Sequence, residues 1–263
     1  MTRRAFLLSG AIGVLAGASV IRRAAAADSA AWARVPSIRD LIGDRPPRPD
    51  GLLLELPLVW EDGAAVPVRV AAEQGPSLAH GVTAIHLFAT RNPFPEIANF
   101  RFTPRSGRAE VSTRIRLNET QTVFAVAELG NGERILASAD TRITRSGCLL
   151  RSGAAQDEDE MKSRVRVVRG SRSASPAEVV TLITHPMETG LRQGPDGLVR
   201  PKRLIQSLTA DVAGERIFEA EFYRAVASDP YLRFFIAPDV SGDLVLTWTE
   251  DSGRSVRATA AIV

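Results

Sequence analysis

The sequence has little of what most catalytic and cofactor-binding sites require. It contains a single cysteine, Cys148, among 263 residues, so no intrachain disulfide can form. It has no Gly-rich phosphate loop and no Cys-x-x-Cys pair, which argues against a bound nucleotide and against covalently attached haem. After residue 27, no segment reaches the roughly 18 consecutive apolar residues of a membrane-spanning helix. We therefore expect no cofactor and no membrane span.

The N-terminus has the pattern of an export signal. Arg3 and Arg4 precede Phe6 and Leu7, an apolar stretch follows over residues 8–21, and four alanines end at Ala27. A charged start, a short apolar middle and small residues at the end are typical of a cleaved signal peptide. The paired arginines favour a twin-arginine signal over an ordinary secretory signal that happens to carry two arginines. Cleavage is expected after Ala27.

The basic balance of the whole chain disappears with this signal. Four of the 33 basic residues, Arg3, Arg4, Arg22 and Arg23, lie in the signal, which has no acidic residue. Removing the signal leaves 29 basic residues against 30 acidic ones, a net charge of −1. A charge this small gives no electrostatic argument for nucleic-acid binding. In a bacterium, the mature protein is expected in the periplasm.

The first half of the mature chain has the period of two that is typical of strands. Val111, Thr113, Ile115 and Leu117 alternate with Ser112, Arg114 and Arg116, which predicts one face on a core and the other in water. Further strand candidates are 52–60, 66–72, 82–89, 98–103, 121–129 and 134–138. The Asn131-Gly132 pair predicts a hairpin turn, and the prolines of 92–95 (NPFP) predict a rigid turn.

The second half alternates in the same way, around Phe218–Phe222, around Leu244–Trp248 and after the turn at 251–253. Evenly spaced short strands with turn residues between them indicate β-sandwiches. We predict an all-β protein with two immunoglobulin-like β-sandwich domains in tandem. The predicted divisions are an irregular lead-in at 28–50, domains at 51–145 and 163–263, and a cysteine-bearing linker at 146–162 whose acidic run (157–160) is solvated.

The second half resembles SoxZ, the small partner subunit of the sulfur-oxidising carrier. The similarity lies in 182–190 (LITHPMETG), 229–232 (DPYL), 241–244 (SGDL) and 247–251 (TWTED). The first half is similar to SoxY through 92–95 (NPFP), 100–102 (FRF), 113–117 (TRIRL) and 121–127 (QTVFAVA). Together they resemble a SoxY–SoxZ fusion, of the kind associated with quinoprotein dehydrogenases.

This resemblance implies a role for Cys148. In the SoxY family, a cysteine in a Gly-Gly-Cys-Gly-Gly tail carries the sulfur substrate covalently as a swinging arm. Here Gly147 is retained, but Ser146 replaces the glycine before it and two leucines follow the cysteine. Arg145 and Arg151 flank the arm, where they would favour the thiolate and attract an anionic cargo; the alternative is that both arginines are merely solvated linker residues. A buried, incidental cysteine is the structural alternative for Cys148 itself.

The three histidines do not indicate a metal site or a Cys–His hydrolase. His185 precedes Pro186 and Met187, a pair of ligand types that copper accepts, but no second His or Cys lies nearby, so a structural loop role is favoured. His80 and His86 are six residues apart, which is no recognised ligand spacing on a strand, and His86 is expected to be packed. No third orienting group and no oxyanion site mark a hydrolase.

Two functions from different classes remain open. The leading interpretation is a non-enzymatic periplasmic carrier that holds a sulfur-containing intermediate on Cys148 and presents it to redox partners. The partners implied are sulfur-oxidation enzymes or c-type cytochromes, with a quinoprotein dehydrogenase as a further candidate. The alternative is a non-covalent adaptor for a periplasmic quinoprotein dehydrogenase or cytochrome c, in which the altered arm is a relic. A homodimer through a Cys148 disulfide is compatible with the carrier role.

Overall fold

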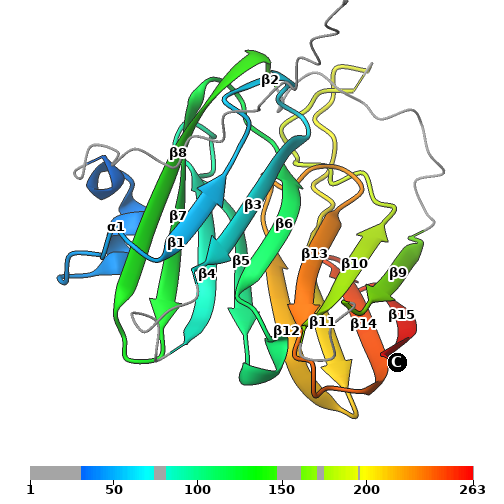
Figure 1. Ribbon diagram of the computed structural model, residues 1–263. Coiled ribbons are helices and arrows are strands. Elements are labelled where there is room, and N and C mark those ends of the chain that lie inside the picture. Colours follow the sequence, from blue (N-terminus) through cyan, green and yellow to red (C-terminus); the bar gives the residue numbers. More distant parts are fainter. Residues whose placement is uncertain (1–30, 74–80, 147–160, 171–174, 195, 263) are drawn as a thin grey trace, which may run out of the picture.

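The computed structural model describes residues 31–73, 81–146, 161–170, 175–194 and 196–262, and its regular structure is almost entirely strand (Figure 1). The first half contains β1 (Leu52–Glu55), β2 (Val59–Asp62), β3 (Val66–Ala72), β4 (Val82–Ala89), β5 (Glu96–Phe102), β6 (Glu110–Ile115), β7 (Gln121–Leu129) and β8 (Arg134–Arg145). The second contains β9 (Ser163–Val168), β10 (Ala177–Ile183), β11 (Ile205–Val212), β12 (Glu215–Phe222), β13 (Tyr231–Ile236), β14 (Gly242–Glu250) and β15 (Ser255–Ile262). Short helices are η1 (Trp32–Arg34), α1 (Pro36–Ile42) and η3 (Pro104–Ser106). The all-β prediction is confirmed.

The strands form two sheets that pack face to face, as Figure 1 shows. The six-stranded sheet has the order β1-β3-β6-β13-β10-β9, and the nine-stranded sheet has the order β15-β14-β11-β12-β5-β4-β7-β8-β2. Each sheet therefore contains strands from both halves of the chain. The predicted turn at Asn131-Gly132 is confirmed, since it joins β7 to β8 with Gly132 at a φ of 83°.

The two tandem domains are present, but they do not form two separate bodies. Strand β5 of the first domain pairs with β12 of the second along five residue pairs, Phe102↔Phe218 to Ala98↔Phe222. In the other sheet, β6 pairs with β13. Both sheets thus run without interruption across the domain boundary, which alternation within single strands could not reveal.

One hydrophobic core extends through both domains. The rings of Phe100 and Phe102 from the first domain contact Phe218 of the second, at centroid distances of 6.4 and 5.6 Å. Phe218 in turn stacks on Phe234 of the facing sheet at 4.3 Å. Since these rings are almost fully buried and each buries on the order of 150–250 Å² of surface, the boundary is as apolar as the interior of a single domain.

Successive antiparallel pairings place several strand ends together. In the nine-stranded sheet, β8 and β14 run in the same direction, because the five strands between them alternate. The ends of β8 and β14 therefore lie at one end of the sheet, here called the upper end (Figure 1). The loops over 184–204 lie at this end as well.

Two local predictions were wrong. The expected strand over 52–60 is split into β1 and β2, because Pro57 has no N–H to donate to a ladder. The lead-in over 28–50 is not irregular throughout, since it contains α1. Pro36 begins this helix, and Ile38 and Ile42, four residues apart, lie buried against the outer face of the nine-stranded sheet. Within the described part of the chain, no helix has the length and apolarity to cross a membrane.

Candidate functional site

The arm predicted to carry cargo begins where β8 ends. Cys148, Gly147 and Arg151 lie outside the described residues, whereas Arg145 and Ser146, immediately before them, are described. We call Arg145 and Ser146 the arm root. It lies at the upper end of the nine-stranded sheet, on a strand held between β7 and β2.

Backbone and side-chain contacts hold the arm root. The carbonyl of Arg145 accepts a hydrogen bond of 2.9 Å from the backbone N–H of Gly63. The Arg145 guanidinium donates to Glu61 at 2.8 Å, and the two side chains are 65% and 79% exposed. Ser146 donates to the side-chain oxygen of Asn118 at 3.4 Å. Because the Glu61 carboxylate partly neutralises the positive charge of Arg145, this arginine attracts an anionic cargo less strongly than the sequence implied.

Below the arm root, a buried amide ties the neighbouring loops together. Asn118 donates its backbone N–H to the side-chain oxygen of Asn92 at 3.0 Å, and the Gln121 amide donates to the same oxygen at 3.0 Å. The Asn92 amide nitrogen donates to the carbonyl of Arg116 at 2.8 Å. Asn92 therefore connects the loop that receives Ser146 to the end of β6.

Arg116 continues this connection into the second domain. Its guanidinium donates to the carbonyls of Met187 (2.6 Å) and Pro186 (3.2 Å) and to the hydroxyl of Ser228 (2.8 Å). The period-two pattern placed Arg116 on the water face, which is wrong: the residue is only 8% exposed. The sequence pattern describes one sheet face, whereas the carbonyls that bury Arg116 belong to a loop about 70 residues away in the chain.

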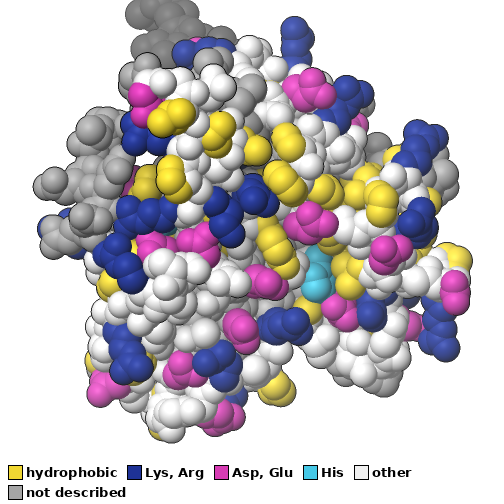
Figure 2. Space-filling view, turned by 180° about the vertical axis from the view of Figure 1, so that it is seen from behind, with side chains coloured by type: hydrophobic (Ala, Val, Ile, Leu, Met, Phe, Trp, Pro, Cys, Tyr) yellow, Lys and Arg dark blue, Asp and Glu magenta, His cyan; other side chains and the backbone are white. Residues whose placement is uncertain are grey.

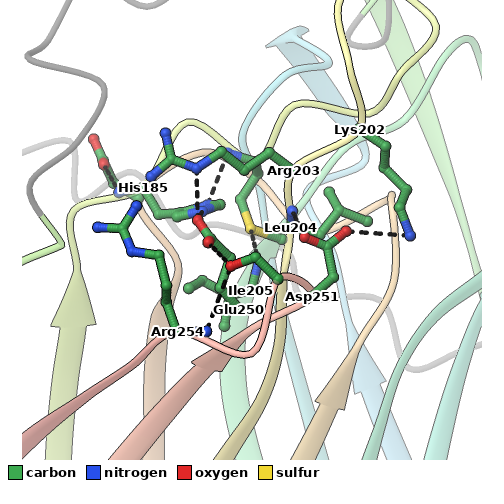
Figure 3. Close-up of polar contacts among 11 residues, drawn as sticks. His185, Lys202, Arg203, Leu204, Ile205, Glu250, Asp251 and Arg254 are labelled. Carbon is green, nitrogen blue, oxygen red and sulfur yellow. Dashed lines mark hydrogen bonds and ion pairs between the residues drawn. The ribbon is translucent and has the colours of Figure 1, made fainter.

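The loop that receives Arg116 begins at His185, which is buried in a polar cluster (Figure 3). The ring Nδ1 of His185 accepts the backbone N–H of Met187 at 3.1 Å, so Nε2 carries the proton and donates to Glu250 at 3.0 Å. Arg203 donates to the same Glu250 oxygen at 2.6 Å, and Ser252 donates to the other oxygen.

Burial and hydrogen bonding set the charges in this cluster. Burial lowers the pKa of His185 below its ordinary value, despite the opposing effect of Glu250. For Glu250, burial acts to raise the pKa, but hydrogen bonds from Ser252, Arg203 and His185 outweigh it and lower the pKa to about 2. The cluster is thus a neutral imidazole beside a carboxylate paired with Arg203. Both ring nitrogens of His185 are occupied, which fits the structural loop role.

His86 is also packed, as predicted. Its Nδ1 lies 2.8 Å from the side-chain oxygen of Asn99, and its Nε2 lies 2.7 Å from Glu128. The Asn99 amide nitrogen donates to Glu221 of the second domain at 3.0 Å, so this network also crosses the domain boundary. His80 lies outside the described residues. Among the described side chains, no cluster of three or more His, Cys, Asp or Glu residues could hold a metal ion.

A cavity of about 390 Å³ lies at the upper end between the 92–95 turn and the second domain. Phe94 and Glu96 line it from the first domain, and Lys202, Tyr223 and Arg224 line it from the second. Arg224 lies over the ring of Phe94 at 4.1 Å, and Lys202 pairs with Asp251 at 3.2 Å. The charged side chains that line the cavity are therefore largely paired within the protein. We interpret the cavity as part of the contact between the domains and not as a ligand site.

Comparisons with known proteins match both halves of the chain. The family model of the sulfur oxidation protein SoxY matches residues 38–148, and that of the sulphur oxidation protein SoxZ matches residues 165–261. No curated protein matches the chain.

Among solved structures, the sulfur carrier protein SoxY from Chlorobium limicola f thiosulfatophilum is 30% identical. The match covers 44% of this chain and 99% of that one, with a TM-score of 0.37. A superoxide reductase (neelaredoxin) from Ignicoccus hospitalis is 18% identical, over 36% of this chain and 82% of that one, with a TM-score of 0.32. Both TM-scores are low, so the assignment of the two halves rests on the two family models.

Proposed function

The chain belongs to the SoxY and SoxZ families as a fusion of the two, and we propose that it carries a sulfur-containing intermediate covalently on Cys148. Sulfur-oxidation carrier function follows from the families themselves. The finer assignment, to one cysteine and to a covalent bond, is supported by one observation above all: the SoxY family match ends at residue 148, which is the only cysteine of the chain.

The arm root supports this assignment mechanically. The strand before Cys148 is paired on both sides, with β7 and β2, and its last residue is held by Gly63 and Glu61. A thiol three residues beyond Arg145 can lie at most about 10 Å from the strand end, at ~3.3 Å per residue. A short arm on a rigid base presents its cargo within a small volume, which suits transfer between enzymes.

The loading reaction is a two-electron oxidation. The Cys148 thiol loses its proton, and the thiolate sulfur forms a bond to the outer sulfur of thiosulfate. The product is a cysteine S-thiosulfonate, and two electrons leave to an oxidant, for which c-type cytochromes are the proposed class. The protein supplies the nucleophile and its position, whereas the partner accepts the electrons, so the carrier is not itself an enzyme.

Export to the periplasm forms part of the proposal. The twin-arginine pattern at Arg3 and Arg4 supports it. The proposed partners are periplasmic sulfur-oxidation enzymes and c-type cytochromes, and a quinoprotein dehydrogenase is the partner that the fused form suggests.

A second candidate function is a non-covalent adaptor for such a dehydrogenase or cytochrome. Specific replacements favour it, since Ser146, Leu149 and Leu150 stand where the family's arm has glycines. Glycine provides backbone freedom that serine and leucine lack, so the sequence predicts a stiffer arm than a Gly-rich one.

Intact mass spectrometry separates the two functions. The mature protein is incubated with thiosulfate and an oxidised c-type cytochrome from the source organism. We expect one thiosulfonate adduct per chain and two equivalents of reduced cytochrome per adduct. Cys148→Ser should abolish both signals while leaving the unfolding curve unchanged. An adduct that survives Cys148→Ser would contradict carriage on this thiol, whereas no adduct together with complete protection of the thiol from iodoacetamide would favour the adaptor. Non-reducing electrophoresis of the same sample tests the Cys148-linked dimer.

A further inference from the structure

Strand β2 and the residue before it, Leu58, expose a run of apolar side chains at the edge of the nine-stranded sheet. Leu58 is 71% exposed, Val59 is 54% exposed and Trp60 is 36% exposed, and the three are consecutive. Among the described strands, β2 has only one neighbour, β8, so its other edge is unpaired. Proteins normally protect such an edge with charges, prolines or a covering element, because it invites association. In Figure 2, hydrophobic side chains gather toward the upper part of the reverse face.

This strand lies directly beside the arm root. Strands β2 and β8 are parallel, with Trp60 opposite Ile143 and Asp62 opposite Arg145. Neighbouring strands lie about 4.8 Å apart. Three residues span at most about 10 Å, so Trp60, two residues before Asp62, lies within the distance that the chain from Arg145 to Cys148 can cover, and Val59 and Leu58 follow directly beyond it. An enzyme that encloses the thiol therefore approaches the end of the sheet at which β2 lies.

The size of the surface fits a transient partner. Three side chains supply on the order of a few hundred Å², whereas a stable protein–protein interface buries about 1,200–2,000 Å² in total. Short-lived encounters lie at the low end of the size range. A carrier must leave each enzyme after transfer, so a small apolar contact is of the right strength, whereas a stable dimer would need far more surface.

We propose that Leu58, Val59 and Trp60 form a docking patch for the enzyme that acts on the group carried by Cys148. This inference rests on the proposed function. The partner is a protein with an apolar surface beside the entrance to its active site. Trp60 lies at the end of the docking patch closest to the arm root, and aromatic residues are the commonest anchors of such contacts.

The test compares loading rates of two matched double variants. Leu58→Ser/Val59→Ser removes two side chains of the docking patch that are 71% and 54% exposed. Leu198→Ser/Val199→Ser removes the same pair of residue types at 69% and 57% exposure in the second domain. Each purified chain is incubated with thiosulfate and the periplasmic fraction of the source organism. The initial rate of adduct formation is then measured against chain concentration by intact mass.

For the docking-patch variant, we expect the concentration that gives half the maximal rate to rise about tenfold, with the maximal rate unchanged. The control variant should behave as wild type. Reaction of Cys148 with iodoacetamide, which needs no partner, should be equal in all three chains.

Other results would overturn the inference. Equal loading curves for the docking-patch variant and wild type would show that the partner binds elsewhere. A change in the iodoacetamide rate would show that the docking patch contacts the arm of the same chain and not a partner. A wild-type dimer in sedimentation that Leu58→Ser/Val59→Ser converts to monomer would assign it to a second copy of the chain. If wild type forms no adduct although iodoacetamide labels Cys148, the proposed function itself fails, and the docking patch loses its partner with it.

Discussion

The arm root and the polar cluster around His185 lie at the same end of the nine-stranded sheet, yet they hold their charges in opposite ways. Arg145 and Glu61 pair at 65% and 79% exposure, whereas Glu250, which pairs with Arg203, is 2% exposed beside the neutral, fully buried His185. An exposed ion pair contributes little to stability, while removing one member of a buried one is costly. The upper end therefore combines a buried polar cluster, to which Arg116 ties the first domain through the carbonyls of Pro186 and Met187, with an exposed arm root whose charges can change without loss of the fold.

The largest loss of stability is expected from Arg116→Met, which acts on the buried side of this comparison. Methionine keeps most of the apolar stem but leaves the carbonyls of Met187 and Pro186 without their charged donor. Hydrogen bonds to charged groups contribute about 1.5–3 kcal/mol each, so we expect a loss of about 3–5 kcal/mol in the free energy of unfolding. Urea denaturation measures it. The control is Arg114→Met, because Arg114 is exposed on the neighbouring β6; equal losses for the two variants would contradict the role of Arg116.

The next effect concerns pH. In the folded state the pKa of Glu250 is about 2, below its ordinary value of 4.5. A carboxylate with a depressed pKa contributes its full stability above pH 4.5, and this contribution is lost as the pH falls toward 2. The loss amounts to about 3 kcal/mol at 1.36 kcal/mol per pKa unit. His185, whose pKa is lowered from 6.5, adds a loss that begins as the pH falls through 6.5, because the unfolded chain takes up the proton first.

Glu250→Gln isolates the carboxylate contribution. This variant should be less stable at neutral pH, and its unfolding free energy should fall less steeply than that of wild type between pH 4.5 and 2. Urea unfolding at a series of pH values gives the comparison. Glu119→Gln is the control, since Glu119 is 57% exposed and pairs with Arg91 at 3.3 Å. Parallel curves for wild type and Glu250→Gln would show that the cluster does not hold the carboxylate ionised.

A smaller effect is expected at the connection between the two regions. Asn92→Ala removes the acceptor of the Asn118 N–H and the donor to the Arg116 carbonyl. Leaving buried groups unpaired lowers the free energy of unfolding by about 1–3 kcal/mol. The backbone N–H of Asn118 should also lose its protection from hydrogen exchange. Asn118→Ala keeps the backbone N–H and loses only the side-chain contact with Ser146, so it should retain that protection. If both variants retain it, Asn92 does not hold the loop.

The sequence predicted the parts of this molecule that depend on local pattern. Strands 66–72, 82–89 and 121–129 have the predicted bounds, because alternation and turn residues act over a few positions. The joining of the domains was beyond such patterns. Nothing local to Arg116 indicates that carbonyls of the second domain surround it, and nothing in β5 indicates that β12 is its neighbour. Helix α1 did leave a sign, a proline followed by isoleucines four apart, but seven residues are too few to establish a helical period.

The candidate site divides in the same way. The family resemblance pointed to Cys148, and composition alone made it the only thiol. The apolar strand beside the arm was predicted as part of one continuous strand over 52–60. Its exposure follows from Pro57, which ends β1, and from the parallel pairing of β2 with β8 at the sheet edge. Strand patterns predict which residues alternate, but not whether a strand lies in the centre of a sheet or at its edge.

The smallest effect on stability is expected at the arm root, from Glu61→Gln. This change breaks the 2.8 Å pair with Arg145 and should alter the free energy of unfolding by less than about 0.5 kcal/mol, because both side chains are exposed. It should still be visible in the chemistry of Cys148. Arg145, freed of its carboxylate, attracts anions more strongly, so an anionic aromatic disulfide should react with the thiol up to about twofold faster, whereas neutral iodoacetamide should not. Salt at about 1 M shortens the Debye length to ~3 Å and should remove the difference. A rate increase that is equal for both reagents would mean that Glu61 restrains the arm root mechanically and not through its charge.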